Sequence, residues 1–394
     1  MKKKFLFPLL FPLLIGCFSR NNANSSNGGE NSAIIIPTSS KKGSLLFTEL
    51  HTGSLNVYDR AIEVSNYTDE DIELTGYTIN IYKQSEKTVY QKIELNGKLK
   101  SKMAYVIVDS KASEPLLNKS NLIVDNLMID GSWPLSLSNN GSEYDFLGII
   151  GYQYAYAKKC SYARKEGSME PRDKFDEYDW IAYDTENISL LGEMYPPLSD
   201  VELLEGPKLT KENFDTPLTE NEGAGSGGAA KVNLRYLGDG DTTNFTLPSD
   251  KVDTYLNTYE TVRYIFINTP EISHGDPNTA EPWGEAAKKY NNTVLKNAKS
   301  YAIQTIKNHG LRDTYGRLLG LVWYSNKNNP QPEDYVCLNF EMVREAYAFY
   351  YFAEDNHSMF YKGLSYVNFI KNAEAYAKRL GLRIHGEVDP DFDY

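Results

Sequence analysis

A strand that ends in a charged turn is the feature that most limits what the C-terminal part of this chain can fold into. Residues 261–267 are mostly β-branched and aromatic, which favours a strand, and Pro270 fixes the backbone in the turn that follows. Arg263 lies within this strand, and Glu271 directly follows Pro270. The sequence therefore brings an arginine and a glutamate to one end of the same strand.

An acidic turn and a second arginine accompany this strand along the chain. Residues 238–242 read Gly-Asp-Gly-Asp-Thr, and residues 313–317 read Asp-Thr-Tyr-Gly-Arg. Each motif alone is typical of an ordinary turn, because Asp and Gly favour turns whatever a protein does. Their joint order around the strand is more specific, and it predicts a site to which Asp241 and Arg317 also contribute.

Residues of these types suit the hydrolysis of a phosphodiester. The planar guanidinium group of an arginine forms two parallel, charge-assisted hydrogen bonds to a phosphate, which a lysine cannot match. A glutamate at the rim of the site can take the proton of the attacking water. A hard divalent cation, held by Asp241 and by oxygens of residues 268–269, would stabilise the developing charge.

In this order and spacing, the motifs resemble those of the staphylococcal nuclease (thermonuclease) family, over residues 231–386. The resemblance implies a nuclease that uses Ca²⁺ and an OB-fold barrel that carries helices, an α+β fold. It also assigns a role to each of these residues: the calcium ligands Asp241, Asn268 and Thr269 (through its carbonyl), the phosphate-binding catalytic residues Arg263 and Arg317, and the general base Glu271.

Asn268 departs from the family pattern, which has an aspartate at this position. An amide oxygen can bind a cation but brings no negative charge, so we expect weak calcium binding, toward the range of roughly 0.1 to 1 mM. Two other functions stay open. One is a nuclease fold that has lost efficient catalysis and binds nucleic acid or a protein; the other is a purely structural protein of the cell envelope.

Hydrophobic patterns predict the elements of this C-terminal part. Gly381 is expected to end the last helix, since a glycine commonly follows the final helical turn. The aromatic side chains of residues 347–352 are expected to be mainly core. The predicted strands are residues 234–237, 243–247, 261–267, 302–306 and 318–324, and the predicted helices are residues 282–298, 340–352 and 361–380.

The N-terminus resembles the signal of a bacterial lipoprotein. A basic start precedes an apolar stretch at residues 5–15, which is shorter than the roughly 20 residues needed to cross a bilayer. Residues 14–17 (Leu-Ile-Gly-Cys) look like a lipobox, so we expect a signal peptide over residues 1–16, a lipid anchor on Cys17 and a flexible tether over residues 17–43. Phe18 stands where an aspartate would favour the inner membrane, which predicts an outer-membrane or cell-surface protein that faces outward.

Residues 44–195 show short strands between turn residues, the pattern of an all-β sandwich. Residues 63–67, 72–77 and 135–141 resemble the lamin-tail domain, which implies an immunoglobulin-like sandwich in which Arg164 and Trp180 are structural. Since no catalytic set stands out there, we expect a spacer or a module that binds a protein or nucleic acid. Residues 196–230 are expected to form a linker to the nuclease-like domain at residues 231–394.

Net charge and the spacing of histidines and cysteines limit the functions that the sequence allows. The formal net charge of −12 does not match the basic surface of a tight duplex binder, although a hydrolase can act on flexible single strands through a local arginine pocket. The five histidines and the cysteines Cys160 and Cys337 show no metal-ligand spacing, which predicts two unpaired buried thiols and no zinc. The sequence thus favours a monomeric, membrane-anchored nuclease that degrades extracellular DNA or RNA for nucleotide scavenging.

Overall fold

The computed structural model describes residues 45–392, with gaps at residues 54, 186, 194–202, 221–222, 274–278 and 352–356. The expected signal peptide, the lipid anchor on Cys17 and the tether lie outside the described residues. Lys42–Tyr394 forms one compact unit. Within the described ranges, no helix has both the length and the apolar character needed to cross a bilayer.

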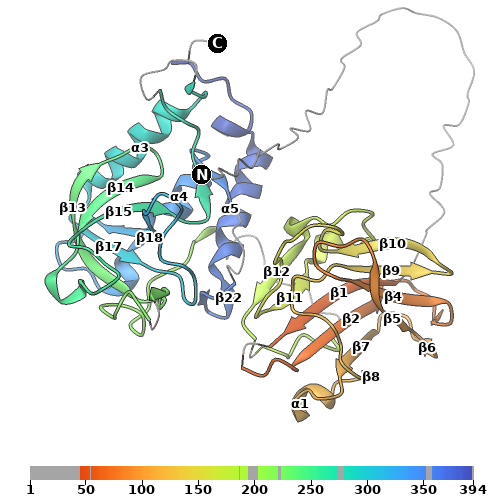
Figure 1. The fold of residues 1–394 in the computed structure, drawn as a ribbon. Coiled ribbons are helices and arrows are strands. Elements are labelled where there is room, and N and C mark those ends of the chain that lie inside the picture. The colour runs from red at the N-terminus through yellow and green to blue at the C-terminus, as the bar shows by residue number, and fades with distance from the viewer. Residues whose placement is uncertain are drawn as a thin grey trace, which may run out of the picture. The chain divides into compact units, whose positions relative to one another are not determined.

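The N-terminal part of this unit contains two sheets that share one hydrophobic core (Figure 1). One sheet has the order β21-β22-β12-β11-β1-β2-β7-β8, in which β21 (Phe360–Tyr361) and β22 (Leu364–Ser365) come from the C-terminal part. The other sheet has the order β10-β9-β4-β5, and β3 pairs with β6. The elements are β1 (Leu45–Thr52), β2 (Arg60–Asn66), β3 (Ile72–Glu73), β4 (Tyr77–Tyr82), β5 (Val89–Glu94), β6 (Lys98–Leu99), β7 (Ala104–Asp109), α1 (Glu114–Leu117), β8 (Leu122–Val124), β9 (Leu135–Asn139), β10 (Ser142–Leu147), β11 (Ser161–Arg164) and β12 (Trp180–Tyr183).

Arg164 and Trp180 are buried in this part and contact each other. A guanidinium nitrogen of Arg164 lies 2.9 Å from Oδ1 of Asp145, and both side chains are fully buried. The other oxygen of Asp145 accepts a hydrogen bond from the backbone N–H of Phe47 at 2.8 Å, so the carboxylate joins β10 to β1. The Arg164 guanidinium also lies 4.9 Å from the centre of the Trp180 ring. Removal of either charge would leave the other buried and unpaired.

The C-terminal part is built on a closed barrel. Its sheet has the order β15-β14-β13-β17-β18-β19, and an additional parallel pairing of β15 with β18 closes the ring (Figure 1). This closure matches the barrel that the sequence predicts. The elements are β13 (Ala229–Leu237), β14 (Thr242–Thr246), β15 (Tyr259–Tyr264), β16 (Ile267–Asn268), α3 (Gly284–Asn297), β17 (Ser300–Gln304), β18 (Leu318–Ser325), β19 (Val336–Cys337), α4 (Leu338–Arg344), β20 (Phe349–Tyr350), β21 (Phe360–Tyr361), β22 (Leu364–Ser365) and α5 (Tyr366–Leu380).

The helix predicted at residues 340–352 is wrong in its second half. Helix α4 stops at Arg344, and Ala346 adopts a left-handed backbone with φ of 54°. The aromatic residues that follow form β20, in which Phe349 and Tyr350 pair with Asn268 and Ile267 of β16. Aromatic side chains favour strands, and the open edge of β16 gives them a partner that helix periodicity does not reveal.

The last helix is confirmed in its end and shortened at its start. Helix α5 begins after Ser365, whose side chain accepts the N–H of Val367, and it ends at Gly381 with φ of 62°. The predicted first residues instead form the short pair β21–β22. The segment predicted as a linker contributes to the core, because Leu203, Leu209 and Leu218 are buried there.

Within the compact unit, α5 and β22 contact the end of the N-terminal sheet. Strand β22 pairs with β12 through Leu364 and Tyr183. The side-chain amide of Asn368 accepts the N–H of Ala182 at 3.1 Å and donates to its carbonyl at 2.6 Å. The described cysteines, Cys160 and Cys337, are buried free thiols, as expected.

Candidate active site

The acidic turn is fixed against the segment that follows β16. Asp241, just before β14, accepts the backbone N–H of Thr269 on Oδ2 at 3.0 Å. A Cβ atom at Gly240 would lie 2.7 Å from Oγ1 of Thr269, so only glycine lets the two segments approach this closely. Two stretches that are distant in sequence therefore meet at one point.

Arg263 is held in place by four acceptors. One terminal nitrogen donates to the carbonyls of Tyr264 at 2.8 Å and Ile267 at 3.0 Å. The other lies 3.0 Å from Oδ2 of Asp241 and donates to Oδ1 of Asn268 at 2.7 Å. Phe266, with φ of 69°, makes the tight turn that brings these carbonyls back toward the arginine. The guanidinium is thus oriented before any substrate arrives.

Arg317 reaches the same region from the start of β18. Its Nε donates to Oδ2 of Asp313 at 2.6 Å, and one terminal nitrogen donates to Oγ1 of Thr242 at 3.4 Å. Thr242 is the neighbour of Asp241 and pairs across the sheet with Arg263. The structure therefore brings the two predicted arginines to one side of the acidic turn.

Glu271 lies two residues beyond Thr269 and is exposed. Its backbone N–H donates to Oε2 of Glu281 at 2.9 Å, and its carbonyl accepts the N–H of Glu281 at 2.9 Å. Glu271 lines a cavity of about 450 Å³ together with Trp283, just before α3, and Tyr290, within α3. Of the predicted residues, Asp241, Arg263, Asn268 and Thr269 are in direct contact, Arg317 joins them through Thr242, and Glu271 stands at the adjoining cavity.

Burial and the neighbouring charge of Arg263 shift the pKa of Asp241 in opposite directions. The residue is only 6 % exposed, and burial raises the pKa of its carboxyl group above the ordinary value, while the positive charge of Arg263 opposes this shift. The nearby charge of Asp239 raises the pKa further. A second positive charge beside Asp241 would therefore be stabilising.

The oxygens around Asp241 fit the calcium ion that the family resemblance implies. Oδ1 of Asp239 is buried and has no hydrogen-bond partner, although a buried carboxylate oxygen normally has one. It is a hard oxygen donor of the kind that Ca²⁺ prefers, like the donors that the resemblance assigns to Asp241, the Asn268 side chain and the Thr269 carbonyl. Asp239 was not assigned a role from the sequence, although its spacing of two residues from Asp241 was a usable signal.

The oxygen donors around Asp241 include few carboxylates and therefore carry little negative charge. Among the described residues, no group of three or more His, Cys, Asp or Glu side chains could hold a metal ion. An amide and a carbonyl stand where further carboxylates would strengthen binding, and Asn268 and Asp241 both bond to Arg263. The weak calcium binding expected from Asn268 stays a prediction.

Comparison with known proteins finds a family match for the part of the chain that carries Arg263, Asn268 and Arg317. Residues 261–383 match the family described as "Staphylococcal nuclease homologue", so the chain contains a domain of this type there. The chain is also 36% identical over 99 residues to the SPbeta prophage-derived endonuclease YokF of Bacillus subtilis (strain 168). That alignment covers 25% of this chain and 29% of the relative, so the chain spans less than a third of the relative's length. The acidic turn lies before the start of the family match.

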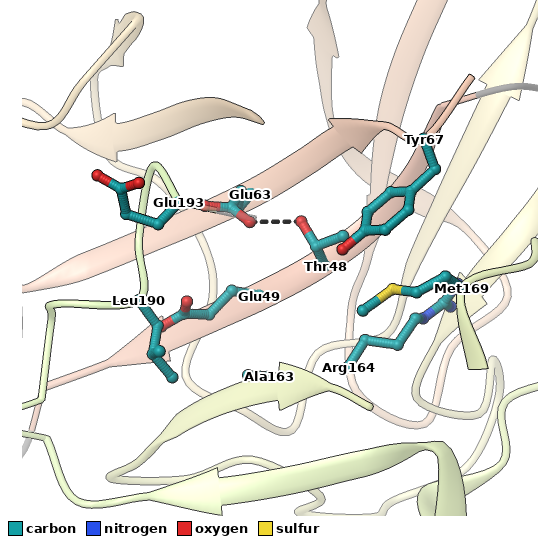
Figure 2. Close-up of a pocket in the computed structure, with 9 residues that line it drawn as sticks. All are labelled: Thr48, Glu49, Glu63, Tyr67, Ala163, Arg164, Met169, Leu190 and Glu193. Carbon is teal, nitrogen blue, oxygen red and sulfur yellow. Dashed lines mark hydrogen bonds between the residues drawn. The ribbon is translucent and has the colours of Figure 1, made fainter. Parts of the chain in front are cut away.

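A second polar cluster lies buried in the N-terminal part (Figure 2). Glu49 of β1 and Glu63 of β2 stand directly opposite each other, and each is 2 % exposed. Glu63 accepts hydrogen bonds from Oγ1 of Thr48 at 2.5 Å and from the N–H of Gly192 at 2.6 Å, while Glu49 accepts one from the hydroxyl of Ser161. The adjoining cavity of about 20 Å³ has room for about one water molecule. The sequence does not reveal this pair, because it depends on the register of β1 and β2.

Proposed function

We propose that this protein is a calcium-dependent nuclease that hydrolyses phosphodiester bonds in DNA or RNA. One observation carries the proposal: Arg263 is oriented by Asp241 and Asn268, with Arg317 beside them, in a barrel whose residues 261–383 match the staphylococcal nuclease homologues. The relative is named an endonuclease, which supports the same reaction class.

Each residue of the site has its own role in the proposed hydrolysis. Arg317, and Arg263 by exchanging protein acceptors of its terminal nitrogens for phosphate, bind the non-bridging oxygens of the scissile phosphate and neutralise the charge that grows on them. Glu271, which is exposed at the cavity, takes the proton of the attacking water on its carboxylate. Asp239, Asp241, Asn268 and the Thr269 carbonyl hold Ca²⁺, which supplies Lewis-acid stabilisation when bound.

The assay uses the purified unit of residues 44–394 with single-stranded DNA, RNA and plasmid. Cleavage should require Ca²⁺ and stop with a chelator. Glu271→Gln should lower the rate at least about a hundredfold, because the amide cannot accept the proton. Glu285→Gln is the matched control, since Glu285 lines the same cavity from the first turn of α3. Equal rates for both variants would contradict the role of Glu271.

A binding module is the second candidate, and Asn268 is the observation that favours it. Its amide donates no charge to a cation and instead accepts a hydrogen bond from Arg263. In that case the arginine pocket would hold nucleic acid or a protein without cleaving it. Binding of single-stranded DNA in the absence of any chelator-sensitive cleavage would favour this candidate over the enzyme.

The cellular setting is part of the proposal. A lipid on Cys17 and the following tether would hold a monomer at the outer membrane or cell surface, where it scavenges nucleotides, with the lamin-tail-like domain as a spacer or a module for protein or nucleic acid. The sequence of residues 14–17 supports this. Labelling with palmitate should tag the wild type, and Cys17→Ala should abolish the tag and leave an unprocessed precursor. A labelled Cys17→Ala protein would contradict the lipobox.

A further inference from the structure

The face of the barrel that carries the catalytic arginine continues into a polar strip. Along β15, residues alternate between exposed or half-buried and buried, so that Tyr259, Thr261 and Arg263 share the outward face. On β14, Thr242, Asn244 and Thr246 share that face in the same way. The cross-strand pairs Thr242–Arg263, Asn244–Thr261 and Thr246–Tyr259 join the two rows. Two paired rows of outward residues therefore lead away from Arg263 along the neighbouring strands β14 and β15 (Figure 1).

Two tyrosines and an arginine stand at the far end of this strip. Tyr236 of β13 pairs with Asn244, and a register shift between Leu234 and Tyr236 leaves Arg235 as an additional residue in the strand. The guanidinium carbon of Arg235 lies 4.0 Å from the centre of the Tyr259 ring and 4.7 Å from that of Tyr236. The three side chains therefore form one stacked group, which we name the Tyr236–Arg235–Tyr259 cluster.

Contacts with Arg235 hold the two tyrosine rings in place, and both rings remain exposed to solvent. Tyr236 is 60 % exposed and Tyr259 is 56 % exposed, so the contacts with Arg235 orient the rings without covering them. Single exposed tyrosines need no explanation, but these two lie on the face of Arg263 and flank a cation. Tyr259 is four residues from Arg263 along β15, or about 13 Å.

The charge of the strip also suits a polyanion. None of the outward residues of β13, β14 and β15, all of which are described, is a carboxylate. Glu260 points inward and pairs with Arg312 at 2.7 Å, and Asp313 pairs with Arg317 at 2.6 Å. Arg235 therefore gives the far end of the strip local positive charge in a chain whose net charge is −12, whereas the charge of Arg263 is balanced by Asp241.

We propose that this strip binds the single-stranded nucleic acid that extends from the scissile phosphate, with bases stacked on Tyr236 and Tyr259 and the backbone near Arg235. Aromatic platforms beside positive charge are how OB-type barrels hold single strands, over about 4 to 16 nucleotides. The proposal deepens the proposed function, on which it rests for the position of the scissile phosphate. It adds a subsite for substrate flanking the cleaved bond.

The test measures binding separately from cleavage. Fluorescence anisotropy with a labelled eight-nucleotide oligodeoxythymidylate, in the presence of a chelator, gives Kd for the wild type, Tyr259→Ala, Tyr236→Ala and Tyr259→Phe. We expect Tyr259→Ala and Tyr236→Ala to raise Kd about 5- to 150-fold, the effect of losing one stacked base, and Tyr259→Phe to bind like the wild type. Tyr376→Ala, which removes the Tyr376–Arg379 contact of α5, is the matched control and should leave Kd unchanged.

An abasic oligonucleotide of the same length separates stacking from a general loss of structure. Removal of the bases should weaken binding to the wild type much more than binding to Tyr259→Ala. The reason is that the wild type loses a base stacked on the Tyr259 ring, whereas the variant has no ring at this position. Equal Kd values for the wild type and both alanine variants, or the same abasic effect in all proteins, would overturn the proposal. A protein that never cleaves but shows these differences would refute the proposed function and leave the subsite standing.

Discussion

At the residue scale, Arg263 explains how the side chains of a site with few carboxylates can still be held in place. Its guanidinium bonds both Asp241 and Asn268, so the arginine that would bind phosphate also orders the side chains that would bind calcium. The sequence predicted that these residues meet, because the order of the motifs resembles that of a nuclease family. It did not predict that Arg263 would bond Asn268, since the bend at Phe266 that allows this depends on a left-handed backbone at an aromatic residue.

Asn268→Asp tests whether the amide limits calcium binding. The substitution adds a charged oxygen of the same length, so calcium should bind more tightly and half-maximal cleavage should move to lower calcium. Calcium titrations by calorimetry and by activity measure both quantities. Asn297→Asp, at the exposed end of α3, adds the same charge away from the site and should change neither. An unchanged calcium response in Asn268→Asp would place residue 268 outside the metal site.

At the element scale, periodicity predicted elements whose partners are local and failed where the partner is distant. Helix α5 was predicted because its apolar spacing and Gly381 are visible in the sequence. Strand β20 was not, because Phe349 and Tyr350 take their conformation from β16, more than eighty residues away. The same limit hid the Glu49–Glu63 pair, which exists only through the register of β1 and β2.

Gly240→Ala tests the close approach of the acidic turn to Thr269. The new Cβ atom would lie 2.7 to 2.9 Å from side-chain atoms of Thr269, so the turn must move and the bond from the Thr269 N–H to Asp241 should weaken. We expect weaker calcium binding and slower cleavage, with a loss of stability on the order of 1 kcal/mol. Calcium titration and thermal unfolding measure these. Gly310→Ala, which meets nothing within 4 Å, should leave both unchanged, and equal behaviour of the two variants would contradict the role of Gly240.

At the scale of the whole molecule, the described unit couples a barrel with a candidate active site to a β-rich part with a buried acidic pair. The sheet of that part includes β21 and β22, which follow the barrel in sequence, and Lys371 of α5 donates to the carbonyls of Glu177 at 2.6 Å and Trp180 at 2.9 Å. Loss of stability in the N-terminal part is therefore expected to loosen α5 as well. Protonation of Glu49 and Glu63 is therefore expected to change the stability of the whole unit, α5 included.

Burial, together with repulsion from Glu63, raises the pKa of Glu49 to about 8, and burial raises that of Glu63 to about 7. The hydrogen bonds from Ser161 to Glu49 and from Thr48 to Glu63, and the positive charge of Lys119, oppose these shifts without reversing them. The folded protein therefore holds protons that the unfolded chain, with pKa values near 4.5, has released. The stabilisation from these protons is complete below about pH 4.5 and is lost as pH rises through 7 to 8.

Thermal unfolding between pH 6 and pH 9 should therefore show a Tm that falls by several degrees, since each kcal/mol shifts Tm by about 2–4 °C in domains of 150 to 250 residues. Glu49→Gln replaces the protonated acid by a neutral amide of similar shape, so its Tm should fall less and exceed that of the wild type at pH 9. Glu193→Gln is the matched control, because Glu193 lines the same cavity but is exposed, and it should follow the wild type. If Glu49→Gln and the wild type lost stability in parallel, the pH dependence would have to come from other groups, because Glu49 would then carry its charge in the folded and the unfolded protein alike.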